Sequence, residues 1–150
     1  MNDAIAVFFD IGETLASAIV RSGHLVRLER YPFVPDVLER LRSGEAGVSV
    51  GLISNTGHES AERLAAVLSD AGLSDLVDAD LCLFSSVEGM DKSQPALFAR
   101  AVMRAGLPST RCVFVGEDAD ERAVAASAGL RVSPHPLHAL HLVESEFFAA

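Results

Sequence analysis

Residues 4–12 read AIAVFFDIG, and this stretch is the starting point for predicting the fold. Six apolar residues, Ala4 to Phe9, are followed directly by Asp10 and, two residues later, by Gly12. A short apolar run that ends in polar and glycine residues is typical of a buried strand. Asp10 therefore lies where the chain is expected to leave a sheet, a position at which a lone aspartate is most often a turn residue or a helix cap.

Four more apolar runs follow along the chain: Val48 to Ile53, Leu81 to Phe84, Cys112 to Val115 and Leu130 to Val132. Segments with helical periodicity alternate with these runs, at residues 36–42, 61–68, 96–105 and 119–128, and a glycine follows each of them. This alternation predicts an α/β protein built on a parallel sheet with helices on both faces.

The chain changes character between the first run and the helix at 36–42. Two apolar-rich segments, Ala18 to Val20 and Leu25 to Leu28, flank the sequence RSGH, which contains a turn glycine. We predict a β-hairpin flap over about residues 16–31. Since no linker, repeat or low-complexity stretch occurs, we expect residues 1–150 to form one domain.

Charge and composition argue against some classes of partner. The chain has 21 acidic and 12 basic residues and a formal net charge of −9, which repels the phosphate backbone of nucleic acids. The run from Ala4 to Phe9 is too short for a signal peptide or a membrane span, so we expect no membrane association and a cytoplasmic location. Cys82 and Cys112 lie inside apolar runs and are interpreted as reduced packing residues.

Ligands of parallel sheets bind beyond the carboxyl ends of the strands, so the residues after each apolar run are the candidates for a site. Ser54 and Asn55 follow the second run, and they could equally cap a helix. Lys92 stands at the start of a helix, which is unfavourable for the helix dipole and favours a functional role. Residues 116–121 hold four carboxylates, which indicate a cation site rather than a solvated loop.

Taken together, four segments resemble the four motifs of the haloacid dehalogenase superfamily, in the order that the family requires. These are FFDIGETL at residues 8–15, ISN at 53–55, KSQPALF at 92–98 and VFVGED at 113–118. The resemblance spans essentially the whole chain. It implies a three-layer, Rossmann-like α/β fold whose five sheet strands, numbered along the chain, lie in the order 5-4-1-2-3.

The resemblance also implies a reaction. Asp10 would attack phosphorus and become an aspartyl phosphate, so the chain would be a phosphatase or phosphotransferase acting on a phosphorylated substrate. Ser54 and Lys92 would be catalytic and would bind the phosphoryl oxygens. Asn55 would bind substrate beside them, and Glu121 would support the site.

Mg²⁺ is the cofactor that the resemblance implies. Its ligands would be the Asp10 carboxylate, the backbone carbonyl of Gly12 and the Glu117 carboxylate, and it would neutralise phosphoryl oxygens during an in-line transfer. The family usually has an aspartate in place of Glu117. Because the longer side chain keeps the carboxylate, we expect binding to persist and to weaken.

Gly12 departs from the family pattern at a position that matters for the chemistry. Hydrolysing members usually carry a second aspartate here, which protonates the leaving group and later activates water. A positioned general acid is worth roughly 10² to 10⁴ in rate, so alkyl phosphates should be cleaved slowly. Glu13, His24 and His58 are the candidates to replace it. The alternative is a phosphate- or partner-binding protein that has lost turnover.

The intervals between the motifs are short. The interval from Asp10 to Ser54 has room for the hairpin and one helix, and the interval from Asn55 to Lys92 for a helix, a loop and a strand, so neither holds a cap domain of family size. Capless members usually act on large substrates or close the site with another subunit, which would make the protein a homo-oligomer. Dehalogenation is disfavoured because the family's dehalogenases use a cap.

Overall fold

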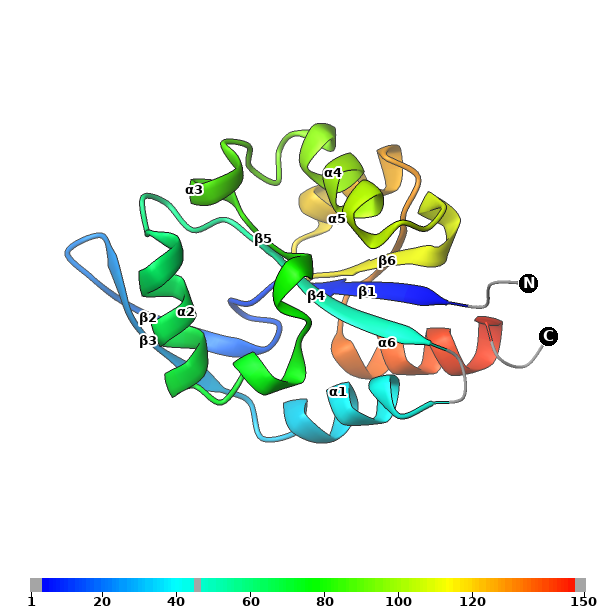
Figure 1. Ribbon diagram of the computed structural model, residues 1–150, viewed down its shortest axis with the longest axis horizontal. Coiled ribbons are helices and arrows are strands. Elements are labelled where there is room, and N and C mark those ends of the chain that lie inside the picture. Colours follow the sequence, from blue (N-terminus) through cyan, green and yellow to red (C-terminus); the bar gives the residue numbers. More distant parts are fainter. Residues whose placement is uncertain (1–3, 45–46, 148–150) are drawn as a thin grey trace.

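The computed structural model describes residues 4–44 and 47–147 and has a five-stranded parallel sheet at its centre (Figure 1). Each strand pairs in parallel with its neighbours. The α/β class and the Rossmann-like sheet predicted from the apolar runs are therefore confirmed. From one edge to the other, the strands are β5 (Cys82–Phe84), β4 (Val48–Ser54), β1 (Ile5–Phe9), β6 (Cys112–Val115) and β7 (Arg131–Ser133).

The strand order can be compared with the prediction once the hairpin is set aside. The hairpin strands take the numbers 2 and 3, which is why the labels β5-β4-β1-β6-β7 differ in detail from 5-4-1-2-3. Numbered within the sheet alone, the order is 3-2-1-4-5, which is the predicted order read from the opposite edge. The first strand of the chain therefore lies at the centre, between β4 and β6.

The register of the strands brings their carboxyl ends to one edge of the sheet. Phe9, the last residue of β1, is paired with Leu52 of β4 and with Val115, the last residue of β6. Strand β4 continues to Ser54, which is paired with Phe84 at the end of β5. Because these strands are parallel, the loops after β1, β4, β5 and β6 leave the sheet on the same side.

Helices cover both faces of the sheet. Successive side chains of β1 point alternately into the two cores that lie between the sheet and these helices. Ile5, Val7 and Phe9 pack in the core that also holds buried residues of α1, α2 and α6. Ala6 and Phe8 pack in the core shared with α4 and α5. The helices are α1 (Val34–Arg42), α2 (Ala61–Asp70), α3 (Ser85–Glu88), α4 (Pro95–Ala105), α5 (Ala119–Ser127) and α6 (Pro136–Leu142), which a π-helical turn continues at Val143–Phe147. Short 3-10 turns lie at Ser74–Leu76, Ala79–Leu81 and Ser109–Arg111.

Within the described ranges, every helix is too short or too polar to cross a membrane.

The predicted hairpin is present as β2 (Ala16–Arg21) and β3 (His24–Arg30), which pair antiparallel and lie against α2 (Figure 1). Its turn residues Ser22 and Gly23 both have positive φ, 53° and 77°, as a two-residue hairpin turn requires. The described part of the chain between β1 and β4 forms only this hairpin and α1, and the part between β4 and β5 forms α2 and two 3-10 turns. This content is consistent with the predicted lack of a cap domain.

Strands β5 and β7 begin one residue later than predicted because backbone groups there are used by the preceding turn. The Leu81 N–H donates to the Asp78 carbonyl at 2.9 Å, which places Leu81 in a 3-10 turn, so β5 begins at Cys82. The Leu130 N–H donates to the Ala125 carbonyl at 3.2 Å and closes the end of α5. The last strand therefore lies one residue later than predicted.

Gly51 in β4 marks a close approach to the turn before β5. A Cβ at this position would lie 2.3 Å from the Leu81 carbonyl oxygen and 2.9 Å from the Phe8 ring. Because the backbone oxygen cannot move aside, we expect Gly51→Ala to lower the free energy of unfolding by about 2 kcal/mol. Urea denaturation followed by circular dichroism measures this change.

Gly47→Ala is the matched control, because a Cβ at Gly47 would meet only the Ala4 Cβ, at 4.0 Å. We expect its effect to stay within about 0.5 kcal/mol. Equal losses for Gly47→Ala and Gly51→Ala would contradict the close approach of β4 to Leu81.

Candidate active site

Asp10 lies where β1 leaves the sheet. Its N–H donates to the Val115 carbonyl at 2.8 Å, which extends the pairing of β1 with β6 by one residue. Its carboxylate atom Oδ1 accepts a hydrogen bond from the Ile11 N–H at 2.8 Å. Since Asp10 is only 7% exposed, the sheet holds a carboxylate in a largely desolvated position.

Lys92 supplies the countercharge. Its Nζ donates to Asp10 Oδ1 at 2.7 Å and lies 2.8 Å from Glu121 Oε1, and its side chain is 4% exposed. The Glu121 oxygen accepts no well-directed hydrogen bond, so this second contact is ionic. Lys92 is the only lysine in the sequence, and the other basic side chains that carry a fixed charge are arginines. The one compact ammonium group of the chain thus lies between two carboxylates.

Asn55 fixes the loop that carries Lys92. Its Oδ1 accepts a hydrogen bond from the Lys92 N–H at 3.0 Å, which ties the loop after β4 to the loop before α4. The Lys92 loop is closed by two more bonds, from the Asp91 N–H to Gln94 Oε1 at 3.0 Å and from the Ser93 N–H to Asp91 Oδ1 at 2.8 Å. Asn55 therefore positions the lysine, while its predicted contact with substrate stays a prediction.

Ser54, the last residue of β4, is 7% exposed and lines the same cavity as Asp10. Among the described residues, none forms a hydrogen bond with its hydroxyl. Thr56 differs, because its N–H donates to Ser85 Oγ at 2.8 Å and its Oγ1 lies 2.6 Å from Ser86 Oγ. The Ser54 hydroxyl is thus available to an oxygen of a ligand.

Burial raises the pKa of the Asp10 carboxyl above its ordinary value, because desolvation penalises the charged form. Lys92 and the Ile11 N–H act in the opposite direction, and the negative charge of Glu117 adds to the increase. Glu117, which lies just after β6, is therefore close enough to Asp10 for the two carboxylates to repel each other. A cation bound by both would favour their ionised forms.

The acidic loop after β6 does not form one cation site. Asp118 is the N-cap of α5 and accepts hydrogen bonds from two N–H groups of the first helical turn, at 2.8 and 3.0 Å. Glu121 lies in the first turn of α5 and pairs with Lys92. Among the described residues, no group of three His, Cys, Asp or Glu side chains is placed to hold a metal ion. Two of the four carboxylates are thus used by α5 and by Lys92, and the cation site predicted with Glu117 stays a prediction.

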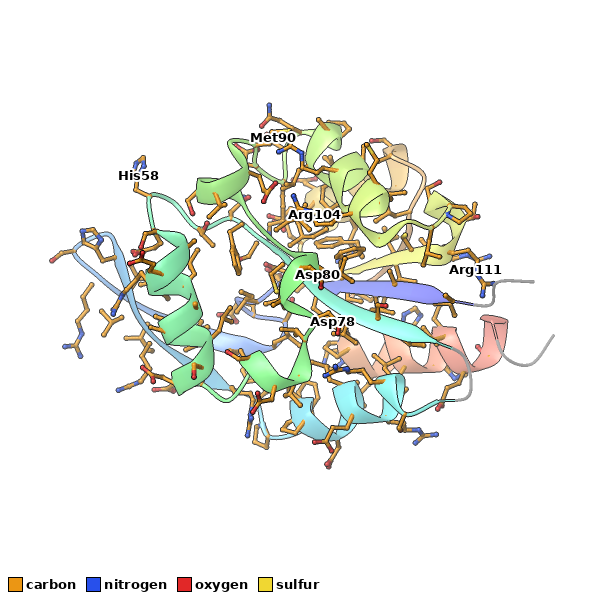
Figure 2. The ribbon with its side chains drawn as sticks, in the orientation of Figure 1. His58, Asp78, Asp80, Met90, Arg104 and Arg111 are labelled. Carbon is orange, nitrogen blue, oxygen red and sulfur yellow. The ribbon has the colours of Figure 1, made fainter. Side chains whose placement is uncertain are left out.

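None of the three candidates to replace the missing acid lines the cavity at Asp10. Glu13 is exposed and has a left-handed backbone, with φ of 62°. His58 projects away from the body of the protein (Figure 2). His24, at the tip of the hairpin, has its Nδ1 3.4 Å from Glu59 Oε1. The space beside Gly12 itself is open, because a Cβ there would meet no atom within 4 Å.

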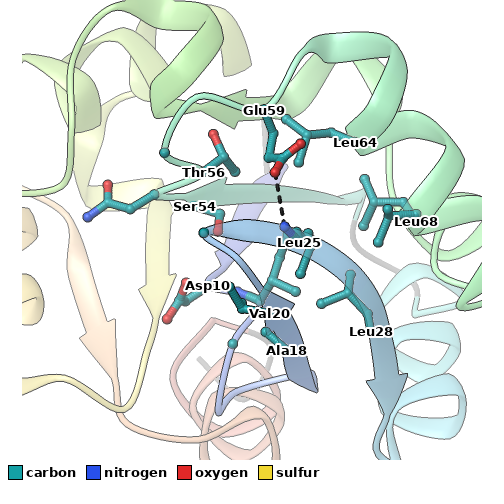
Figure 3. Close-up of a pocket in the computed structure, with 16 residues that line it drawn as sticks. Asp10, Ala18, Val20, Leu25, Leu28, Ser54, Thr56, Glu59, Leu64 and Leu68 are labelled. Atoms are coloured by element: carbon teal, nitrogen blue, oxygen red, sulfur yellow. Dashed lines mark hydrogen bonds between the residues drawn. The ribbon is translucent and has the colours of Figure 1, made fainter.

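Glu59 and Arg63, which we call the hairpin clip, fasten the hairpin to the start of α2. Glu59 Oε1 accepts a hydrogen bond from the Leu25 N–H at 2.9 Å (Figure 3). Arg63 Nη2 donates to the Leu25 carbonyl at 3.0 Å. The bond from Leu25 lowers the pKa of Glu59, so the carboxylate is ionised at neutral pH. Sequence reasoning missed the clip, because nothing in the sequence marks two polar residues that meet a hairpin 34 and 38 positions away.

A cavity of about 300 Å³ lies between the hairpin and α2, and its lining includes Asp10 (Figure 3). The structure brings the predicted site residues together around it, because the loops after four strands share one edge of the sheet. Asp10, Gly12, Ser54 and Asn55 line the cavity, while Lys92 and Glu117 interact with Asp10 from beside it.

A family model described as haloacid dehalogenase-like hydrolase matches residues 12–129, which is well over half of the chain. The match begins two residues after Asp10 and reaches the glycine that follows α5.

Similar proteins include a phosphatase and a dehalogenase. The chain is 28% identical over 128 residues to phosphatase MT3486 of Mycobacterium tuberculosis (strain CDC 1551 / Oshkosh), covering 85% of this chain but only 56% of that relative. A dehalogenase solved with an intermediate complex is 28% identical, with a TM-score of 0.61 over 71% of this chain and 44% of the dehalogenase. A HAD-superfamily hydrolase of Ehrlichia chaffeensis has a TM-score of 0.71 at 14% identity, over 97% of this chain and 98% of that one, and shows the fold alone.

Removal of the Lys92 ammonium group should destabilise the folded protein, because the charge of Asp10 is then left without a partner. Lys92→Met leaves the Asp10 carboxylate buried without a cation, and we expect the free energy of unfolding to fall by about 3 kcal/mol. Urea denaturation at neutral pH in EDTA measures the loss. Arg100→Met is the control, because Arg100 is largely exposed and its partner Glu88 keeps a second ion pair with Arg104, so the loss should stay below about 1 kcal/mol.

The double variant Lys92→Met/Asp10→Asn separates charge from packing. With both charges gone, most of the stability lost in Lys92→Met should return. A double variant as unstable as Lys92→Met alone would show that the lysine acts through its packing instead of its charge.

The hairpin clip should weaken only under acid conditions. A carboxylate whose pKa is lowered by folding stabilises the folded form at every pH above the pKa that it has in the unfolded chain, here 4.5. This stabilisation is lost as the pH falls through the pKa of the folded form. We therefore expect the hydrogen-exchange protection of the Leu25 amide to be constant from about pH 7 to 4.5 and to fall below it. Glu59→Ala should remove the protection at every pH, and a wild-type loss complete above pH 5 would argue against Glu59.

Proposed function

The chain belongs to the haloacid dehalogenase-like hydrolase family, and from this premise we propose that it transfers phosphoryl groups through an aspartyl phosphate on Asp10, in a reaction that depends on Mg²⁺. The observation that carries the proposal is the buried contact of 2.7 Å between Lys92 Nζ and Asp10 Oδ1. It keeps a carboxylate and an ammonium group together beside the Ser54 hydroxyl, at the edge of a cavity. This combination suits an anionic substrate that must approach an anionic nucleophile.

The residues at the site fit Mg²⁺. The donors would be the carboxylates of Asp10 and Glu117 and the backbone carbonyl of Gly12, and oxygen ligands of this kind are those that Mg²⁺ prefers. The fit is supported by the repulsion between Asp10 and Glu117, which adds to the rise that burial causes in the pKa of the Asp10 carboxyl. When bound, Mg²⁺ would offset the negative charge of phosphoryl oxygens.

Asp10 can act as the nucleophile through Oδ2. Both hydrogen bonds that its carboxylate accepts from described residues end on Oδ1, which leaves the other oxygen without a donor from the described chain. In the first step Oδ2 bonds to phosphorus, and the bond from phosphorus to the leaving group breaks, with the electron pair staying on the leaving group. In the second step the oxygen of a water molecule bonds to phosphorus and the bond from phosphorus to Oδ2 breaks, which restores the Asp10 carboxylate. Phosphate departs, and one proton of the water passes to solvent.

Lys92 and Ser54 would hold the phosphoryl oxygens during both steps. The ammonium group reduces the repulsion between the Asp10 carboxylate and the phosphate, and the hydroxyl donates to one phosphoryl oxygen. Glu121 keeps the ammonium group in place through the 2.8 Å ionic contact. Asn55 keeps the lysine loop in place through its bond to the Lys92 N–H.

Gly12 limits the range of leaving groups. It has no side chain to donate a proton, and Glu59, a carboxyl group in the cavity lining, is kept ionised by its lowered pKa. A leaving group would therefore depart as an anion, which favours acyl and aryl phosphates over alkyl phosphates. Gly12 also favours the second candidate function, a phosphate- or partner-binding protein without turnover, because the usual proton donor is missing.

A substrate comparison tests the proposal. In Mg²⁺, we expect acetyl phosphate and 4-nitrophenyl phosphate to be hydrolysed at least about 10² times faster than an alkyl phosphate such as glycerol phosphate. Phosphate release measures the rates, and EDTA should abolish them. Asp10→Asn is the control, and equal rates for the wild type and this variant would end the proposal.

Gly12→Asp distinguishes the enzyme from the binding protein. If only the acid is missing, the new carboxyl should raise the rate on alkyl phosphates by about 10² or more, while acyl phosphates change little. A Cβ at position 12 would meet no atom within 4 Å, so the new side chain can leave the backbone without a clash. Binding of phosphate by the wild type without turnover of any of these substrates would favour the binding protein.

A further inference from the structure

We propose that the cavity between the hairpin and α2 binds a small apolar group of the substrate, so that the protein acts on aryl or acyl phosphates with a compact apolar body. This inference rests on the proposed function, because it states which kind of chemical group carries the phosphate that Asp10 would attack. It names a class of substrate that neither the family match nor the similar proteins specify.

The cavity has a polar end and an apolar end. Asp10, Ser54 and Asn55 lie at the polar end, where the strands leave the sheet. The remaining walls come mainly from aliphatic side chains of the hairpin and of α2, which Figure 3 shows gathered on the other side of Asp10. These aliphatic residues include Ala18, Val20, Leu25, Leu28, Leu64 and Leu68. A phosphate at Asp10 would thus have apolar surface next to its leaving group.

The hairpin is built to present apolar side chains to this cavity. Ala18 pairs with Leu28, and a shift in register after Ile19 then pairs Val20 with Leu25. All four residues of these two pairs line the cavity. A bulge of this kind changes the direction of side chains, and bulges are frequent beside active sites.

The hairpin clip makes the cavity less suited to a polar leaving group such as a sugar. Glu59, in the loop before α2, is with Asp10 a charged residue of the cavity lining, and its Oε1 is already bound to the Leu25 N–H. The hydroxyl groups of a sugar would therefore find few partners beyond Ser54, Asn55 and Thr56, and burying unpaired hydroxyl groups is unfavourable. An aromatic ring or a short acyl chain needs no such partner.

The size of the cavity agrees with a compact group. A cavity of about 150 Å³ lined by aliphatic side chains already accepts a benzene ring. The volume here is about 300 Å³, enough for one ring or a short acyl chain together with the phosphate. Ligand pockets for larger molecules reach about 1,000 Å³.

Two unrelated features therefore favour the same substrates. Gly12 removes the proton donor, which favours leaving groups that are stable as anions. The wall formed by Val20, Leu25 and Leu64 favours leaving groups that are apolar. Aryl and acyl phosphates satisfy both conditions.

Binding of phosphonates tests the cavity without requiring turnover. We expect benzylphosphonate to bind the wild-type protein in Mg²⁺ at least about tenfold more tightly than methylphosphonate, by isothermal titration calorimetry. Val20→Ser should reduce this preference to about threefold or less, and Ala18→Phe should abolish it because the new ring occupies the cavity. Thermal melting checks that both variants are folded, as expected for two exposed positions.

Val26→Ser is the matched control, since Val26 is the same residue type on the same hairpin, is 41% exposed against 58% for Val20, and does not line the cavity. It should keep the tenfold preference. Equal binding of the two phosphonates by the wild type, or a preference that Val20→Ser and Ala18→Phe leave unchanged, would overturn the inference.

Hydrolysis of acetyl phosphate, measured in parallel, separates this inference from the proposed function. Hydrolysis that depends on Asp10, without a benzyl preference, would overturn the cavity assignment alone. A benzyl preference that Val20→Ser reduces, without any hydrolysis, would overturn the proposed function and support the cavity assignment.

Discussion

The buried ion pair of Asp10 and Lys92 is the interaction on which the arrangement of the site depends. Two opposite charges that are 7% and 3% exposed are tolerable only when they meet with good geometry, and here Nζ lies 2.7 Å from Oδ1. For the two side chains to meet, β1 must lie at the centre of the sheet, with Asp10 directly after it, and the loop before α4 must extend over the end of β1. The hydrogen bond from the Lys92 N–H to Asn55 holds that loop beside the end of β4, while the bond from the Asp10 N–H to Val115 holds the carboxylate beside β6.

The features that could be predicted from the sequence are those set by local pattern. The apolar runs indicated the parallel sheet, and its geometry placed Asp10, Ser54 and Lys92 around one point, because ligand sites lie at the carboxyl ends of parallel strands. What depends on side chains meeting across the fold could not be predicted. The clip formed by Glu59 belongs to this kind. The use of Asp118 as a helix cap is a local contact, but the density of acids in the loop had concealed it.

Gly12 and the hairpin together explain how a family scaffold would be adapted to one class of substrate. The position that normally carries the acid has open space and no functional group. Beside it, a bulged hairpin presents aliphatic side chains and is fastened to α2 by the clip, so the wall of the cavity is held in place. Loss of the acid would be tolerable for a leaving group that needs no proton, and the apolar wall would select such groups.

The central claim is that Asp10 accepts a phosphoryl group, and trapping the intermediate tests it most directly. The protein is mixed with acetyl phosphate and Mg²⁺, reduced with borohydride and digested for peptide mass spectrometry. Borohydride converts an aspartyl phosphate to homoserine, so we predict homoserine at position 10 in the wild type. An unmodified Asp10 in protein that is consuming substrate, or homoserine at another position, would contradict the claim.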